Sequence, residues 1–149
     1  MRVCGWTALI AVVLVSVAGM AAAAEVRVLG VEAVAQPLRA LAADFTKATG
    51  HRVVFTIAPP AVVMKKIEAK ETHDAVIVAE PAMDDLERDR IVKPESRVRL
   101  AYDGADTYEG GLMTNGSVPQ AAREFLRFLI DPEAHAKWLA AKLEPVADH

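Results

Sequence analysis

The sequence predicts an α/β fold: a single three-layer lobe in which a mostly parallel sheet is flanked by helices. Short apolar runs of strand type alternate with segments of helical spacing between residues 26 and 88, an order that favours right-handed crossovers and a parallel sheet. The run at 74–79 is also continuously apolar after its first residue. Such a run is typical of a parallel strand that is covered on both faces.

The individual elements follow from apolar spacing and from residues that end helices. Strands are expected at residues 26–30, 53–57, 74–79 and 98–101. A first helix carries Val34, Leu38, Leu41 and Phe45 on one face and ends at Gly50, a usual left-handed cap. A second helix runs through Val63 and Ile67, and a third, short helix covers residues 82–88.

The C-terminal third of the chain predicts two more helices. Ser117 and Pro119 open the first, whose apolar face carries Ala122, Phe125, Leu126 and Leu129. The second begins at Asp131-Pro132-Glu133, an N-cap followed by proline at the first helical position. We expect Trp138 to serve packing. Residues 102–108 (YDGADTY) are polar and turn-forming, and we interpret them as a linker or a tight reversal.

Composition excludes several classes of protein. The chain has 149 residues, which suits one compact domain, and a single cysteine, which excludes a disulfide framework and a cysteine-cluster metal site. It has 17 basic and 20 acidic residues and a net charge of -3. This balance gives no reason to expect nucleic acid or an anionic membrane as a partner.

The first 24 residues have the pattern of a secretory signal peptide. A short basic start is followed by the apolar run ALIAVVLVSVA and by small residues that end at Ala24. The run is short for crossing ~30 Å of hydrocarbon. We therefore expect cleavage after Ala24, export to the periplasm, and a mature chain of residues 25–149 that is not embedded in a membrane.

No pattern in the chain predicts catalysis, a cofactor or a metal site. There is no nucleophile motif, phosphate loop or zinc-binding pair of histidines. The four histidines are isolated at His51, His73, His135 and His149. Asp84, Asp85 and Glu87 form an acidic group that is expected to be a solvated helix face. The sequence thus predicts a protein that is not an enzyme.

A binding site is expected where the first three strands end. Ligands in parallel sheets sit beyond the carboxyl ends of the strands, near helix N-termini. Here these connections are residues 30–33, 58–61 and 79–81. We expect main-chain and helix-end contacts there, with Glu32 and Glu80 as specificity elements. The candidate ligand-binding residues are Gly30, Val31, Glu32, Ala33, Pro59, Pro60, Ala61 and Glu80.

Three segments carry a resemblance to a known family. They are residues 24–69 (AEVRVLGVEAVAQPLRALAADFTKATGHRVVFTIAPPAVVMKKIEA), residues 73–92 (HDAVIVAEPAMDDLERDRIV) and the tail FLRFLIDPEAHAKWLAAKLEP at residues 125–145. Together they resemble the first lobe of the molybdate-type periplasmic solute-binding proteins of ABC importers, which have the type 2 periplasmic binding fold. In that family a second lobe is inserted before the returning tail. Residues 102–108 stand in its place here, so the resemblance implies a chain reduced to the first lobe.

The resemblance also implies a ligand chemistry that this chain does not repeat. Molybdate-type binders use a serine hydroxyl from each first-lobe loop, and the matching positions here are Ala33 and Pro60. Both lack a hydroxyl, and Pro60 also lacks a backbone N–H. Glu32 adds a carboxylate that would repel a dianion. Molybdate is therefore the ligand implied by the resemblance alone.

The function expected from the sequence is that of an extracytoplasmic solute-binding protein of an ABC transporter. Its partners would be a small solute, an oxyanion such as molybdate by family resemblance, and an ABC permease. The alternative is a single-lobe periplasmic adaptor or sensor that binds a protein partner through the same loops. A third hypothesis, a hidden enzyme activity, would need ionisable groups that converge.

Overall fold

A six-stranded mixed sheet forms the centre of the protein. The computed structural model describes residues 22–146, so the predicted signal peptide lies outside the described residues except at 22–24. The strand order is β2-β1-β3-β5-β4-β6. The strands are β1 (Glu25–Val31), β2 (Arg52–Ala58), β3 (Ala75–Ala79), β4 (Val98–Tyr102), β5 (Thr107–Leu112) and β6 (Glu144–Pro145).

The sheet combines a parallel half with an antiparallel half. Strand β1 pairs in parallel with both β2 and β3. Strand β5 is antiparallel to β3 and β4, and β6 is antiparallel to β4. Four strands, β1 to β4, therefore point in one direction. This arrangement confirms the predicted α/β class with a mostly parallel sheet.

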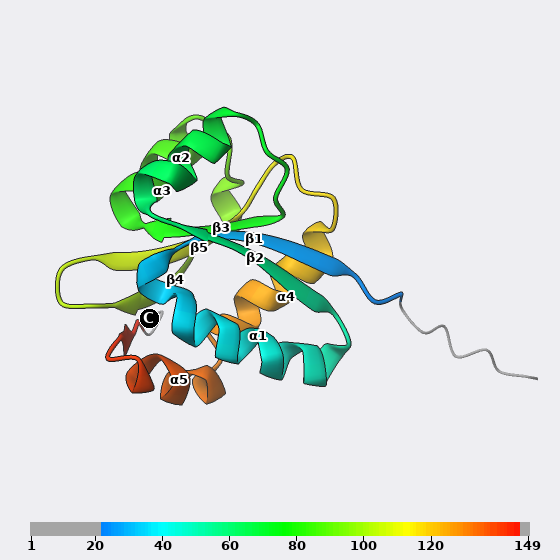
Figure 1. Ribbon diagram of the computed structural model, residues 1–149, viewed down its shortest axis with the longest axis vertical. Helices are drawn as coiled ribbons and strands as arrows, with labels where there is room; N and C mark the ends of the chain where they lie inside the picture. Colours follow the sequence, from blue (N-terminus) through cyan, green and yellow to red (C-terminus); the bar gives the residue numbers. More distant parts are fainter. Residues whose placement is uncertain (1–21, 147–149) are drawn as a thin grey trace, which may run out of the picture.

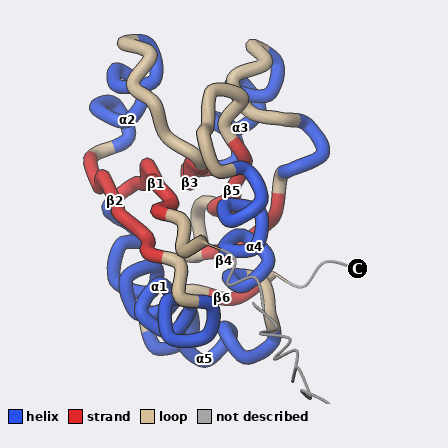
Figure 2. Tube along the Cα trace, turned by 90° about the vertical axis from the view of Figure 1, so that its right-hand side faces the viewer, coloured by secondary structure: helices blue, strands red, loops and turns tan. Residues whose placement is uncertain are grey.

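Helices cover both faces of the sheet, which gives the three layers that the sequence predicts (Figures 1 and 2). One layer contains α1 (Ala35–Thr49), α4 (Pro119–Leu129) and α5 (His135–Ala140). The other layer contains α2 (Pro60–Glu68) and α3 (Glu80–Arg88). Short 3-10 turns at Glu32–Val34, Pro94–Ser96 and Pro132–Ala134 complete the elements.

The predicted helix ends and apolar faces are confirmed. Gly50 ends α1 with a left-handed φ of 79°, a conformation that costs glycine little. The side chain of Asp131 accepts a hydrogen bond from the N–H of Glu133 at 2.9 Å, as expected of an N-cap. Trp138 is fully buried, and its indole N–H donates to the carbonyl of Leu129 at 3.0 Å. Its role is packing, as predicted.

Residues 102–108 are a tight reversal, and the strand that follows was not predicted. Residues 103–106 connect β4 directly to β5 as a hairpin. Strand β5 contains Gly110 and Gly111, which are unfavourable in strands. A Cβ at Gly110 would lie 2.8 Å from Leu126 Cδ2, and one at Gly111 would lie 2.5 Å from Val92 Cγ1. A side chain at either position would therefore force these neighbouring side chains to shift, which favours glycine in β5.

A buried carboxylate at the amino-terminal end of β3 connects β1 to the entry of α4. Asp74 is only 2% exposed. Its Oδ2 accepts the N–H of Arg27 in β1 at 2.8 Å. Its Oδ1 accepts the N–H groups of Ser117 and Val118, at the entry to α4, at 2.8 and 3.0 Å. One side chain thus satisfies three backbone donors from two distant segments.

We expect Asp74→Ala to lower the free energy of unfolding by roughly 3 kcal/mol, because it leaves three backbone donors without their charged acceptor. Asp74→Asn should lower it by about half as much, since one carbonyl oxygen remains as an acceptor. Urea denaturation measures both changes. Asp89→Ala is the matched control, because Asp89 is exposed and its loss should change stability by less than about 0.5 kcal/mol. Equal effects at both positions would contradict the assignment.

Candidate functional site

The three predicted loops lie at one edge of the sheet. In the parallel register Val31 pairs with Ala58, and Gly30 pairs with Ile77. Strands β1, β2 and β3 therefore end together, and their connections lead into the 3-10 turn before α1, into α2 and into α3. The tip of the β4–β5 hairpin reaches the same end of the molecule, at the left of Figure 1.

A pocket of about 310 Å³ lies at this edge. It has walls from all three connections, from α2 and α3, and from the hairpin. Most of its walls are apolar, and within residues 22–146 its charged lining residues are two acids. The lining residues are Val31, Glu32, Ala33, Pro60, Met64, Val78, Ala79, Ala82, Asp106 and Tyr108.

Four of the eight predicted site residues line this pocket: Val31, Glu32, Ala33 and Pro60. The other four, Gly30, Pro59, Ala61 and Glu80, lie in the same connections but do not line it. The side chain of Glu80 instead pairs with Arg99, at 3.5 Å.

Six lining residues were not predicted as site residues. Met64 lies one helical turn after Pro60 on α2, and Ala82 lies in the first turn of α3. Helical spacing from the loop residues is the signal that could have identified both. Val78 and Ala79 end β3. Asp106 and Tyr108 belong to the hairpin, and only the observed direction of β4 and β5 brings them to this edge.

Hydrogen bonds fix the hairpin that forms one wall. The carboxylate of Asp103 accepts the backbone N–H of Asp106 at 2.8 Å and of Ala105 at 2.9 Å. These bonds, with one from the phenol of Tyr108 at 2.9 Å, lower the pKa of Asp103. Burial, followed by the bond to Asp103, raises the pKa of Tyr108 to about 12. The phenol is thus neutral and already committed as a donor.

The pocket contains few groups that could bind an anion. Its two charged lining residues, Glu32 and Asp106, have no ion pair or side-chain hydrogen bond within residues 22–146. Pro60 has no N–H. The N–H groups of Val62 and Val63, in the first turn of α2, both donate to the carbonyl of Pro59, at 2.9 and 3.0 Å. The start of α2 is therefore largely occupied by its own hydrogen bonds.

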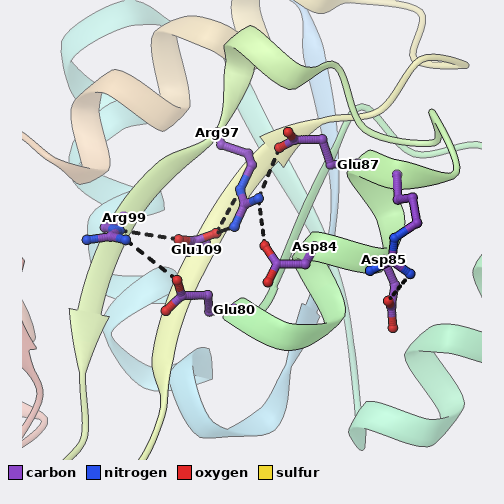
Figure 3. A network of polar contacts seen from close by, with 8 residues as sticks. Glu80, Asp84, Asp85, Glu87, Arg97, Arg99 and Glu109 are labelled. Atoms are coloured by element: carbon purple, nitrogen blue, oxygen red, sulfur yellow. Dashed lines mark hydrogen bonds and ion pairs between the residues drawn. The ribbon is translucent and has the colours of Figure 1, made fainter.

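Beside the pocket, the expected solvated acidic face is in fact an ion-pair network (Figure 3). Asp84 and Glu87 bind the guanidinium of Arg97 at 2.8 and 3.0 Å. Arg97 also donates to Glu109 of β5, whose side chain is only 3% exposed. Asp84 is exposed, as predicted, and Glu87 is half-buried, but sequence spacing could not show that Arg97 lies opposite this face of α3 and pairs with both.

The remaining charges of the network are more exposed. Asp85 pairs with Arg88 at 2.8 Å on the outer side of α3. Arg99 lies between Glu109 and Glu80, at 3.5 Å from each. Burial by itself lowers the pKa of Arg97, but its hydrogen bonds to carboxylates outweigh burial and raise that pKa above its usual value. The network fixes α3, which carries Ala82, against β5.

The histidines do not converge on a site. His51 accepts the N–H of Ala24 at 3.0 Å and lies 3.4 Å from the carboxylate of Glu124. His73 is buried beside Asp74, and its Nδ1 has no partner among the described residues. His149 lies outside the described residues. Within residues 22–146 no group of three or more His, Cys, Asp or Glu side chains could hold a metal ion.

Sequence comparison identifies the family of the chain. The profile of the family described as "Bacterial extracellular solute-binding protein" matches residues 26–105, which is more than half of the chain. The chain belongs to this family. The match ends inside the β4–β5 hairpin, where the molybdate-type resemblance places the missing lobe. A comparison with curated protein sequences found no match. No helix within residues 22–146 is long and apolar enough to span a membrane.

Solved structures of solute-binding proteins share the fold. The substrate-binding domain assigned to a molybdenum ABC transporter from Clostridium difficile is similar with a TM-score of 0.76 and 9% identity, over 84% of this chain and 100% of that chain. The periplasmic molybdate-binding protein of Azotobacter vinelandii gives a TM-score of 0.74 and 12% identity, over 83% and 100%. Iron-bound HitA from Pseudomonas aeruginosa gives 0.67 and 9%, over 78% and 84%. At these identities the likeness shows the fold.

The pKa of Tyr108 gives a spectroscopic prediction. The chain has two tyrosines, so in a Tyr102→Phe background the phenolate absorbance reports Tyr108 alone. We expect a midpoint near pH 12 in the folded protein, and near pH 10 in urea. Adding Asp103→Asn should lower the folded midpoint, because the phenol then loses its charged acceptor. A folded midpoint near 10 would contradict the hairpin geometry.

The network gives a stability prediction. We expect Arg97→Met to lower the free energy of unfolding by about 2–4 kcal/mol, because it leaves the buried carboxylate of Glu109 without its main partner. Arg88→Met is the matched control. Arg88 pairs only with Asp85 among the described residues, with a side chain that is 71% exposed, so its loss should matter little. Urea denaturation compares the two variants, and similar losses would argue against an anchoring role for Arg97.

Proposed function

We propose that this protein is an extracytoplasmic solute-binding protein of an ABC importer, and that it holds its solute in the pocket at the carboxyl ends of β1, β2 and β3. One observation carries the proposal: in a chain of the solute-binding family, the three connections that follow β1, β2 and β3 all contribute walls to one pocket. Parallel sheets bind ligands at this place.

The dimensions and walls of the pocket support a small solute. Its volume of about 310 Å³ is at the lower end of the range for small-molecule sites. Apolar walls favour ligand burial, while a few polar groups give orientation. The β4–β5 hairpin adds a fourth wall through Asp106 and Tyr108. This hairpin partly replaces the surface that a second lobe supplies in two-lobed binders.

The proposal includes location and partners. Residues 1–24 would direct export, the mature chain from residue 25 to residue 149 would be one lobe, and an ABC permease would receive the solute. An oxyanion such as molybdate is the ligand that the resemblance suggests, and two similar structures are of proteins named for molybdenum or molybdate. The family consists of binding proteins, which supports a role without catalysis.

Filling the pocket tests its role. Ala33 is exposed at the pocket wall, so Ala33→Trp should occupy the cavity without disturbing the core. We expect at least one compound in a panel of oxyanions, carboxylates, amines and sugars to raise the Tm of the wild-type protein. At one hundred times its Kd a ligand adds about 2.7 kcal/mol of stability. Ala33→Trp should abolish that shift.

The control for this experiment is Ala136→Trp, at an exposed position of α5 away from the pocket. It should retain the full ligand-induced shift. A shift that survives in Ala33→Trp would place binding elsewhere. The absence of any shift across the panel would contradict the solute-binding proposal itself.

A further inference from the structure

We propose that the solute of this pocket is a small organic cation, a protonated amine with a short apolar body, rather than an oxyanion. This inference rests on the proposed function and specifies the chemistry of the same site. It reverses the charge of the ligand that the resemblance implies.

The first step is the charge of the lining. Glu32 contributes a carboxylate from the end of β1, and Asp106 contributes one from the hairpin. Among the described residues, the pocket lining contains no lysine, arginine or histidine. Neither carboxylate has an ion-pair partner within residues 22–146. A cation in the pocket would be attracted by both, whereas an anion would be repelled by both.

The second step concerns two arginines beside the pocket, Arg97 and Arg99. Arg97 is held by Glu109, Asp84 and Glu87, and Arg99 is held by Glu109 and Glu80 (Figure 3). Both guanidinium groups are thus paired with carboxylates of α3 and β5. They line a separate surface hollow, and neither pairs with Glu32 or Asp106.

The third step is the supply of hydrogen-bond donors, which an anion would need. Pro60 has none on its backbone. The N–H groups of Val62 and Val63 donate to the carbonyl of Pro59, and the phenol of Tyr108 donates to Asp103. Anion sites at helix starts depend on free backbone N–H groups. At the start of α2 most of those groups are absent or used.

The fourth step is the apolar wall. Val31, Val78 and Met64 line the pocket together with small side chains such as Ala79 and Ala82. This surface can bury methyl and methylene groups, and the thioether of a methionine adapts to irregular shapes. A fully hydrated metal ion would gain nothing from it. An alkylammonium ion would place its charge near the two carboxylates and its carbon chain against this wall.

Four probes test the proposal. Butylammonium, butanol and butyrate have similar size but different charge, and molybdate is the ligand that the resemblance implies. Each is titrated into the isotopically labelled protein at pH 7 and constant ionic strength, and Kd is obtained from NMR shifts of pocket amides such as those of Val31 and Ala82. We expect butylammonium to bind at least tenfold more tightly than butanol. Butyrate and molybdate should bind more weakly than butanol.

Two charge-neutralising variants identify the groups responsible. Glu32→Gln and Asp106→Asn should each weaken butylammonium binding about five- to tenfold, and the double variant about fiftyfold, because each removes one attracting charge. Butanol binding should change less than twofold. Glu95→Gln is the matched control, since Glu95 is exposed in the turn before β4, and it should leave all four affinities unchanged.

The outcomes separate this inference from the proposed function. Tighter binding of butyrate or molybdate, strengthened in Glu32→Gln and abolished by Ala33→Trp, would overturn the cation and leave the solute-binding role standing. Butylammonium binding that is insensitive to both charge variants would also overturn the inference. Failure of all four probes to shift pocket amides would overturn it too, while the broader compound panel would decide the proposed function independently.

Discussion

The buried carboxylate of Asp74 holds the end of the sheet that lies opposite the pocket. It collects backbone donors from β1 and from the entry to α4, while its own N–H and C=O bond to Arg27 and Met113. Asp74 thereby links β1, the segment after β5 and the entry to α4, next to the β3–β5 pairing that joins the two halves of the sheet. Since this join is complete at the amino-terminal end of β3, the carboxyl ends of the parallel strands are left free to form a binding surface.

The ion-pair network adds a second constraint at the other side of the pocket. Helix α3 begins at the end of β3 and carries Ala82 in the pocket wall. Arg97 holds the outer part of α3 against β4 and β5, where it also pairs with the buried side chain of Glu109. A buried ion pair is weak evidence for stability but fixes geometry. Here it connects α3, which carries Ala82 in the pocket wall, to β4 and β5.

The sequence predicted the parallel half of the fold well, because its strands and helices obey clear periodicity and its first helix ends at Gly50. It did not predict β5, since Gly110 and Gly111 lower strand propensity and a buried Glu109 breaks the apolar pattern. Those features depend on Leu126, Val92 and Arg97, which are distant in sequence. Local spacing carries no information about such contacts.

The same difference between local spacing and long-range contacts explains which residues of the candidate site could be predicted. Loop residues such as Glu32 and Pro60 follow directly from strand ends, so sequence reasoning could place them at one edge. Asp106 and Tyr108 could not be placed, because residues 102–108 were interpreted without the strand that follows them. Whether the hairpin reaches the pocket depends on the pairing of β4 with β5 and of β5 with β3.

A single lobe limits how tightly the pocket can hold a solute. Burying about 100 Å² of apolar ligand surface contributes roughly 2.5 kcal/mol, and association itself costs at least about 4 kcal/mol of translational and rotational freedom. Attraction from two carboxylates must therefore supply most of the difference, at an open mouth where water screens charge. An open surface of this kind therefore holds a solute only weakly on its own. Tighter capture requires a second surface over Glu32 and Asp106, and a partner that covers this mouth would exclude water and strengthen both charge contacts at once.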